Sequence, residues 1–146
     1  MGRASWRAQL RHVPWRTLAV IAAGGVLGAL ARQGLWALFP HRAGVFDWAT
    51  LGINAAGCAL IGALMTLIAE VRHAHRLTGP FLGVGVLGGF TTFSTYIIEV
   101  QQSIDTGAAA TGLAYLALTL VGALLAVYAG VSATRLLARL HHKERS

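Results

Sequence analysis

The chain has 146 residues and a mass of 15.4 kDa; 55% of its residues are apolar and only 12% are charged. Soluble domains carry roughly a quarter charged residues, so a soluble monomer of this composition could not cover its surface. The 18 glycines lie among Leu, Ala and Val, and the mean hydropathy is +0.61, which excludes a disordered chain. These quantities indicate an integral membrane protein embedded in a lipid bilayer.

The net charge of +7 would favour nucleic-acid binding in a soluble protein. Here the basic residues gather at the chain ends and in one loop, as the positive-inside rule of membrane proteins requires, so we expect no nucleic-acid partner. The single cysteine, Cys58, lies in an apolar run and can form no disulfide within the chain. The sequence shows no Ser-His-Asp set and no paired carboxylates, so we predict no catalytic residues and no enzyme.

Three segments are apolar over the roughly 20 residues that a helix needs to cross the hydrocarbon core: Leu18–Phe39, Trp48–Ala69 and Ala108–Val131. A further segment, third in chain order, runs from Pro80 to Val100. Its middle, residues 88–96, has two glycines followed by hydroxyl residues and is a poor helix in isolation. We therefore predict an all-α membrane protein with four transmembrane helices, the third broken near the bilayer midplane. A glycine-kinked packing helix is the alternative for this segment.

The connections between these helices are short: Pro40–Asp47, Val71–Gly79 and Gln101–Gly107. The sequence divides into a basic N-terminal segment (residues 1–17), a four-helix transmembrane domain (residues 18–136) and a basic C-terminal tail (residues 137–146). Small residues recur at four-residue spacing, which lets helix backbones approach closely. These small residues are Gly24 and Gly28, Gly25 and Ala29, and Gly122, Ala126 and Gly130.

The basic residues are unequally divided between the two sides of the four expected helices. One side has only Arg42, in the connection between the first and second spans. Arg32 lies inside the first span and is not counted. The other side has Arg3, Arg7, Arg11, Arg16, Arg72, Arg76, Arg135, Arg139, Lys143 and Arg145. The positive-inside rule then predicts that both termini are cytoplasmic in a multi-pass protein of the cell membrane.

Asn54 is the only strongly polar side chain in the second span, so it needs a hydrogen-bond partner. A bond that holds two helices together and a place in an ion pathway both remain open for it. Thr50 lies four residues earlier on the same face, and Tyr115 and Thr119 are also four residues apart on the last helix. These groups form a track of neutral hydrogen-bond donors.

Two aromatic residues, Phe93 and Tyr96, follow the expected break in the third span. The edges of aromatic rings carry partial positive charge, and a broken helix exposes backbone groups to ions. Together with the neutral donors, these rings indicate a pathway for an ion or a small polar solute. A unit of four helices is small for enclosing such a pathway, so we expect an oligomer.

Three ordered motifs resemble those of the Fluc (CrcB) family of fluoride channels. The run GGFTTFSTY at residues 88–96 looks like the GGxTTFSTF signature of that family. Residues 50–57, TLGINAAG, resemble its TLxxNxxG motif, and residues 24–32, GGVLGALAR, resemble its GGxxGAxxR motif. The similarity covers all four spans, from about residue 18 to residue 136.

The resemblance implies an antiparallel dimer of four-helix subunits, with two fluoride pores at the interface. It implies a structural sodium ion (Na+) at the dimer axis, held by the backbone carbonyls of Gly88 and Thr91. It also implies six pore-lining residues and two vestibule residues. The pore residues are Asn54, Phe93, Tyr96, Thr50, Tyr115 and Thr119, and the vestibule residues are Arg32 and Glu99. Tyr96 stands where the family usually has phenylalanine, and Ala123 where a further hydroxyl is often found.

The implied function is passive export of fluoride from the cytoplasm, which reduces fluoride toxicity. A small four-helix multidrug or cation exporter is one alternative, but such a mechanism needs an acidic residue buried in a helix. The first helix has none, and Glu70 and Glu99 lie near helix ends. A membrane subunit that packs in a larger complex without transporting is the second alternative.

Antiparallel dimers of one sequence require that sequence to insert in both orientations. A strongly unequal distribution of basic residues favours a single orientation. We therefore expect an oppositely oriented homologue as the partner in a heterodimer, with a homodimer as the alternative.

Overall fold

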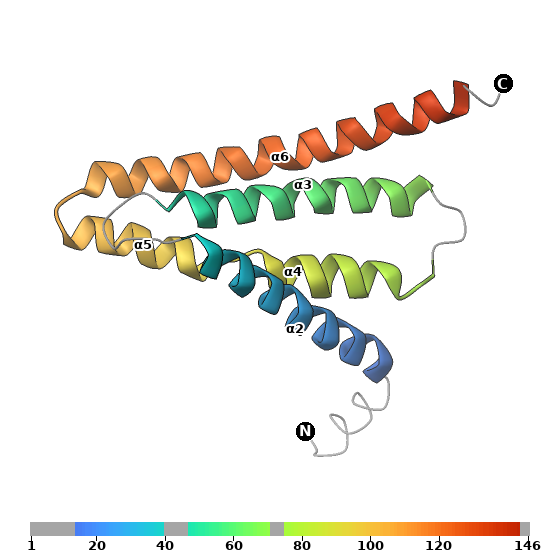
Figure 1. Cartoon of the computed structure of the whole chain (residues 1–146), viewed down its shortest axis with the longest axis horizontal. Coiled ribbons are helices and arrows are strands. Elements are labelled where there is room, and N and C mark those ends of the chain that lie inside the picture. Colours follow the sequence, from blue (N-terminus) through green and yellow to red (C-terminus); the bar gives the residue numbers. More distant parts are fainter. Residues whose placement is uncertain (1–13, 40–46, 71–74, 144–146) are drawn as a thin grey trace, which may run out of the picture.

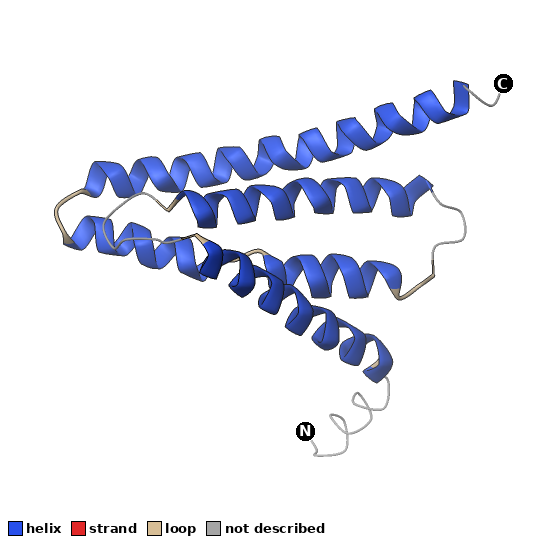
Figure 2. Ribbon diagram, viewed as in Figure 1, coloured by secondary structure: helices blue, strands red, loops and turns tan. Residues whose placement is uncertain are grey.

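The protein is described by a computed structural model that covers residues 14–39, 47–70 and 75–143, with side chains through residue 140. The described part consists of helices and their connections (Figure 2). Three spans are continuous helices, and the third span is assembled from three shorter helical segments. The continuous helices are α2 (Trp15–Leu38), α3 (Trp48–Glu70) and α6 (Ala109–Lys143). The third span contains η1 (Gly79–Leu87), α4 (Gly88–Phe90) and α5 (Ser94–Asp105).

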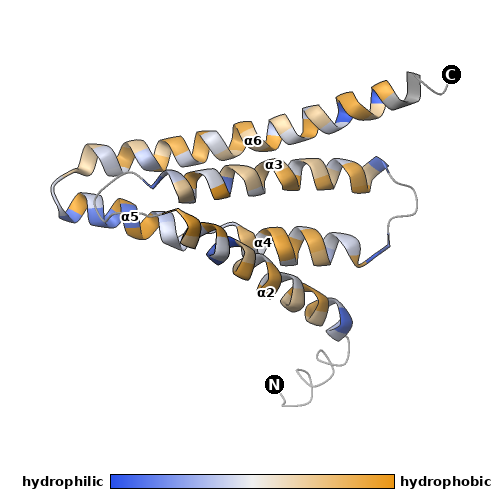
Figure 3. Cartoon of the chain, viewed as in Figure 1, coloured by the Kyte–Doolittle hydropathy of each residue, from blue (hydrophilic) through white to orange (hydrophobic). Residues whose placement is uncertain are grey.

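Four helices of the described part are long and apolar enough to cross a membrane, with lengths of 24, 23, 27 and 32 residues. The 27-residue span runs from Gly79 to Asp105 and includes the short non-helical stretch between α4 and α5. Apolar residues dominate the middle of these helices, and hydrophilic residues gather toward their ends (Figure 3). The prediction of an all-α protein with four membrane-spanning helices is confirmed.

The helices are arranged as two packed pairs (Figure 1). Helices α3 and α6 lie side by side along the length of α3, while α2 crosses η1 and α4 and packs against both. Helix α5 continues the third span and packs against the first part of α6. The start of α2 and the end of α6 lie at the same end of the bundle, as an even number of crossings requires.

The distribution of buried side chains is the reverse of that in a soluble domain. Many large apolar side chains are exposed, such as Leu30 and Leu124, because lipid rather than water surrounds them. Only three large apolar or aromatic side chains are buried in the described part: Ile53, Val100 and Tyr115. The buried polar side chains are Asp47, Thr50, Asn54, Thr66, Thr119 and Thr134. The interior of the described subunit is therefore rich in hydrogen-bonding side chains.

Close helix packing depends on glycines, as the small-residue spacing predicted. A Cβ atom added at Gly24 would lie 2.5 Å from the Phe81 carbonyl oxygen, and one at Gly130 would overlap the Ala59 carbonyl oxygen. Backbones at these two positions touch, and no side chain fits between them. The prediction of a close helix contact is wrong for Gly122, where an added Cβ would meet nothing within 4 Å.

The connection expected from Gln101 to Gly107 is shorter than predicted, because α5 continues to Asp105. Gly107 ends this helix with a φ of 81°, a conformation that glycine adopts without steric cost. The Ala108 N–H donates to the Ser103 carbonyl at 2.8 Å, which is the hydrogen bond of a Schellman motif. The polar residues after Val100 belong to a helix end, and the sequence analysis had assigned them to a loop.

Candidate ion pathway

The centre of the third span is a non-helical stretch of three residues, Thr91 to Phe93, between α4 and α5 (Figure 2). Thr91 has an extended backbone, with a φ of −78° and a ψ of 154°. The Thr92 hydroxyl oxygen accepts the N–H of Thr95 at 3.3 Å and so helps to start α5. The two parts of the span continue in nearly the same direction, so the span bends only slightly (Figure 1).

Asn54 of α3 binds the backbone of this stretch with both ends of its carboxamide. The Asn54 Nδ2 donates to the Thr92 carbonyl oxygen at 2.8 Å, and the Thr92 N–H donates to Asn54 Oδ1 at 2.8 Å. These bonds satisfy backbone groups that a regular helix would have paired. They use one of the two protons on Nδ2, so Asn54 can link the helices and still offer a second N–H.

Arg32 of α2 binds the same region from another helix. Its Nε donates to the Gly89 carbonyl oxygen at 3.3 Å. The carbonyl end of a helix carries partial negative charge, so a guanidinium is stabilising at this place. The bond explains how an arginine is accommodated within an apolar span.

The Asn54 bond also leaves backbone carbonyl oxygens available. In a regular helix the Thr92 N–H would bind the Gly88 carbonyl, but it binds Asn54 instead. Within the described residues, no hydrogen bond outside the regular helices reaches the carbonyl oxygen of Gly88 or Thr91. Free carbonyl oxygens are ligands for hard cations, so these two residues fit the sodium ion that the sequence motifs imply.

Three aromatic rings lead from this stretch toward α6. The Phe93 and Tyr96 ring centroids are 5.0 Å apart in an edge-to-face arrangement. The Tyr96 and Tyr115 centroids are 6.1 Å apart with an interplanar angle of 70°. Phe93 is 70% exposed whereas Tyr115 is 3% exposed, so the row runs from the subunit surface into its interior.

The hydroxyls of the predicted donor track have different partners. Tyr115 donates to the Asp47 backbone carbonyl at 3.3 Å, and Thr50 donates to the Asp47 carboxylate. Thr119 is 8% exposed, and its hydroxyl has no hydrogen-bond partner among the described residues. A buried hydroxyl without a partner is unfavourable, so this group is available to a ligand.

Asp47 is the residue of this region that the sequence analysis missed. Its side chain accepts the N–H groups of Ala49 and Thr50 at 2.9 and 3.1 Å, and it therefore caps the start of α3. The signal was present, because aspartate directly before an apolar run is a typical N-cap, but the residue was read as the end of a loop.

The carboxyl of Glu99 shares a hydrogen bond with that of Asp47, which brings α5 to the start of α3. Burial alone would raise the pKa of Asp47. The hydrogen bonds from Thr50, Glu99 and Ala49 outweigh burial and hold this pKa below its ordinary value. Asp47 is therefore a carboxylate at neutral pH.

The structure thus brings most of the predicted residues into one region. Thr50 of α3 and Tyr115 of α6 both bind Asp47, and the Tyr115 ring contacts Tyr96 of α5. Asn54 binds Thr92, which directly precedes Phe93. Arg32 contacts the carbonyl end of α4, and Glu99 contacts Asp47.

A family model described as "CrcB-like protein, Camphor Resistance (CrcB)" matches residues 19–131. The chain is 50% identical to "Fluoride-specific ion channel FluC 1" of Streptomyces coelicolor over an alignment of 133 residues. This alignment covers 91% of this chain and 83% of that protein. It is 49% identical to "Fluoride-specific ion channel FluC 2" of Thermobifida fusca, over 82% of this chain and 89% of that protein. It is 48% identical to "Fluoride-specific ion channel FluC 2" of Streptomyces avermitilis, over 81% of this chain and 72% of that protein.

Proposed function

The chain belongs to the family of CrcB-like proteins, and we propose that it is a fluoride-specific ion channel through which fluoride leaves the cytoplasm passively. The observation that carries this function is the identity of 50% with a fluoride-specific channel over 91% of the chain. A channel lets its ion move down a gradient, so the protein is not an enzyme. Fluoride enters cells as HF from acidic surroundings and is trapped inside as the anion, which supplies the outward gradient.

Fluoride would pass along the aromatic rings and neutral donors of the candidate pathway. Fluoride is small and strongly hydrated, so a pathway must replace its water with hydrogen-bond donors without binding it too tightly to release. The unpaired hydroxyl of Thr119, the second N–H of Asn54 and the ring edges of Phe93 and Tyr96 are such donors. Thr50 and Tyr115 would complete the pore, and Arg32 and Glu99 would lie at its vestibule.

A sodium ion would be held by the carbonyl oxygens of Gly88 and Thr91 at the axis of an antiparallel dimer. One subunit offers too few of these oxygens to surround a cation, so two subunits would share it. An added Cβ at Gly88 would have only the Gly83 carbonyl oxygen, 3.9 Å away, within 4 Å. The open space at Gly88 and the exposure of Phe93 support a partner at this face.

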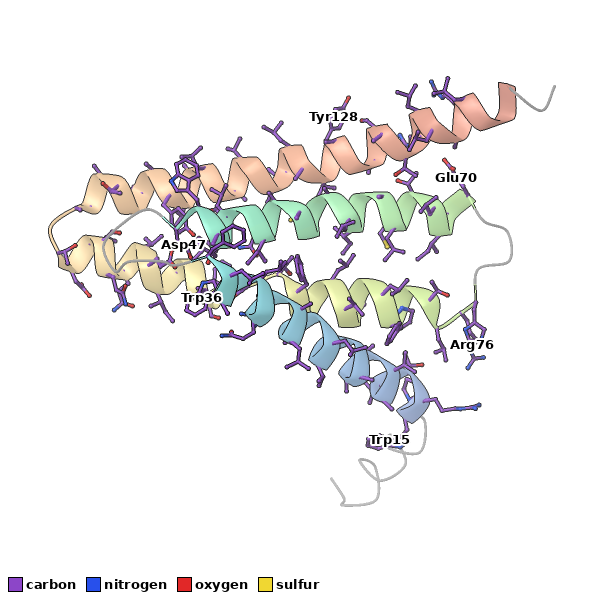
Figure 4. The ribbon with its side chains drawn as sticks, in the orientation of Figure 1. Trp15, Trp36, Asp47, Glu70, Arg76 and Tyr128 are labelled. Carbon is purple, nitrogen blue, oxygen red and sulfur yellow. The ribbon has the colours of Figure 1, made fainter. Side chains whose placement is uncertain are left out.

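We further propose that both termini are cytoplasmic and that the partner is an oppositely oriented homologue. Arg16, Arg76, Arg135 and Arg139 are the described members of the basic side; Trp15, Glu70 and Arg76 lie near this end of the bundle (Figure 4). The remaining basic residues used in this argument lie outside the described residues or at positions whose side chains are not described. They are Arg3, Arg7, Arg11, Arg42, Arg72, Lys143 and Arg145.

The test of function is fluoride efflux, followed with a fluoride electrode, from liposomes that contain the purified protein alone or together with an oppositely oriented homologue. We expect efflux that needs no proton gradient and no cationic drug. Efflux driven only by proton exchange for a cation would favour an exporter instead. No efflux, either alone or with an oppositely oriented homologue, would favour a non-transporting subunit.

The test of orientation is labelling of single cysteines from outside intact cells, after Cys58 is changed to serine. One cysteine is placed in the loop between the first two helices and another in the C-terminal tail. We expect labelling of the loop alone. Equal labelling of both positions would establish dual topology and overturn the heterodimer.

A further inference from the structure

Asp47 lies where the start of α3 meets α5 and α6 (Figure 4). It is 6% exposed, and both of its carboxylate oxygens are engaged. Oδ1 accepts the backbone N–H groups of Ala49 and Thr50. Oδ2 accepts the hydroxyl proton of Thr50.

We propose that Asp47 is a positioning residue of the fluoride pathway, because its carboxylate binds the hydroxyl proton of Thr50 and so keeps Thr50 from donating to fluoride. This inference rests on the proposed fluoride channel. In this proposal, Asp47 determines how many hydrogen-bond donors the passing anion meets.

The argument begins with the single proton of the Thr50 hydroxyl. Thr50 is 1% exposed, so neither lipid nor water competes for this proton. While the proton points to Asp47, Thr50 can present only its oxygen lone pairs to an anion, and these repel fluoride. The low pKa of Asp47 means that the carboxylate persists at neutral pH and keeps the proton.

Asp47 also lies next to the pathway itself. Its backbone carbonyl accepts the Tyr115 hydroxyl, and the Tyr115 ring continues through Tyr96 to Phe93. The titratable groups that face Asp47 are Glu99 of α5 and Tyr115 of α6, and Tyr96 lies beyond Tyr115. A carboxylate in this place repels an approaching anion, so it lowers fluoride flux through two effects of the same sign.

The substitution Asp47→Asn separates charge from helix capping. The two backbone N–H groups of Ala49 and Thr50 require an acceptor, so the amide oxygen keeps the place of Oδ1. The amide nitrogen then takes the place of Oδ2 and donates to the Thr50 oxygen. Since that oxygen now accepts, the Thr50 proton turns away and becomes available to fluoride.

The experiment measures fluoride efflux from liposomes for the full chain, together with its partner if one is required. We expect Asp47→Asn to raise efflux roughly two- to fivefold, about the gain expected from one additional hydrogen bond. Thr50→Val should change efflux by less than twofold in the native background, because there the hydroxyl donates nothing to fluoride. In the Asp47→Asn background, Thr50→Val should reverse the whole increase in efflux, because only in that background does the Thr50 hydroxyl donate to fluoride.

Thr66→Val is the matched control, because Thr66 is a buried threonine of the same helix whose proton goes to the Gly62 carbonyl. It should leave efflux unchanged in both backgrounds. Asp47→Ser, which retains a capping oxygen without the carboxylate, should reproduce the gain if Asp47→Asn fails to fold.

Two results would overturn the inference while the channel function stands. One is native or reduced efflux in folded Asp47→Asn and Asp47→Ser, which would make Asp47 a helix cap and nothing more. The other is an equal effect of Thr50→Val in both backgrounds. Absence of any fluoride efflux from the native protein and its partner would overturn the proposed function and this inference together.

Discussion

The two ends of the α3–α6 pair use buried threonines in opposite ways. At the end near Glu70, Thr66 and Thr134 donate to the carbonyls of Gly62 and Gly130 in their own helices, both at 2.8 Å. At the other end, Thr50 donates to the Asp47 side chain, and Thr119 has no partner in the part of the chain that the structure describes. Burial of a hydroxyl therefore does not mark a functional group. The two ends differ in the acceptor of the hydroxyl proton.

Glycines bring the backbones of α3 and α6 together in the half of the pair toward Glu70, the closed end; the half that contains Thr50 and Asn54 is the open end. At the closed end, added Cβ atoms at Gly62 and Gly130 would overlap backbone atoms of the facing helix, so the interface has no room for an ion. At the open end, α4 stops and Asn54 replaces the helical partners of Thr92. The interruption of the third span therefore leaves backbone carbonyl oxygens available at this end.

The prediction with the largest expected effect tests whether a second subunit packs at Gly88, at the start of α4. Gly88 has open space around its Cα, so Gly88→Val should keep the subunit folded but abolish dimer formation and with it fluoride flux. Gly85, three residues earlier, is the control for packing within the subunit. A Cβ there would lie 2.8 Å from the Ile21 carbonyl oxygen, so Gly85→Ala should lower the free energy of unfolding by about 1–3 kcal/mol.

Size-exclusion chromatography and thermal unfolding in detergent distinguish the two glycine variants. Thr91→Ser keeps the backbone and should be mild. If Thr91→Ser weakened the dimer more than Gly88→Val, side-chain oxygens rather than the backbone would hold the interface and its cation.

The second prediction concerns Asn54, which connects α3 to the non-helical stretch between α4 and α5. Asn54→Asp can still accept the Thr92 N–H but cannot donate to the Thr92 carbonyl, and it places a negative charge in the pathway. We expect fluoride efflux from liposomes to fall by about 100-fold or more while the protein remains folded. Full efflux in this variant would remove Asn54 from the pathway and leave it a purely structural link between helices.

The third prediction compares the two kinds of threonine directly. Valine has the shape of threonine without its hydroxyl, so Thr119→Val removes a donor that no described residue of the protein uses. We expect about tenfold lower efflux together with unchanged or higher thermal stability, because an unsatisfied buried hydroxyl costs about 1–3 kcal/mol. Thr134→Val, which removes a hydroxyl already bound to Gly130, should leave efflux unchanged. Equal efflux in the two variants would contradict the division between the two ends.

This contrast also shows what the sequence could and could not predict. The four spans follow from runs of apolar residues, and the close helix contacts at Gly24 and Gly130 follow from four-residue spacing. Both are local properties that depend on composition and period. Thr119 and Thr134 lie on one helix and look alike in sequence. Only the environment of each hydroxyl distinguishes them.

The partner of Asn54 required the structure for a related reason. An isolated amide in an apolar span predicts that a hydrogen bond exists, but the partner, Thr92, lies 38 residues away on a different element. The end of α5 was misjudged because polarity indicated a loop, whereas Gly107 marks the actual stop. Asp47 was passed over because its role depends on groups from α5 and α6 that come together only in the fold.

The smallest expected effect concerns how stability depends on pH at the start of α3. Hydrogen bonds hold the pKa of Asp47 below its ordinary value, so its charged form stabilises the folded protein above the unfolded pKa of about 3.9. That stabilisation is lost as the pH falls through the lower, folded-state pKa. Asp47→Asn retains the cap with a neutral group and should be less stable than the native protein by about 1 kcal/mol.

Thermal unfolding in detergent across the acidic and neutral range measures this difference. In a Glu99→Gln background, which removes the neighbouring carboxyl of α5, the gap between the Asp47 and Asp47→Asn proteins should stay constant from about pH 8 to pH 5, because Asp47 remains ionised throughout. It should close below about pH 4, where the native carboxylate becomes protonated. A gap that already closed between pH 7 and pH 5 would mean that the pKa is raised by burial. The Thr50 proton would then be released at mildly acidic pH, and the contrast between the open and closed ends would depend on pH.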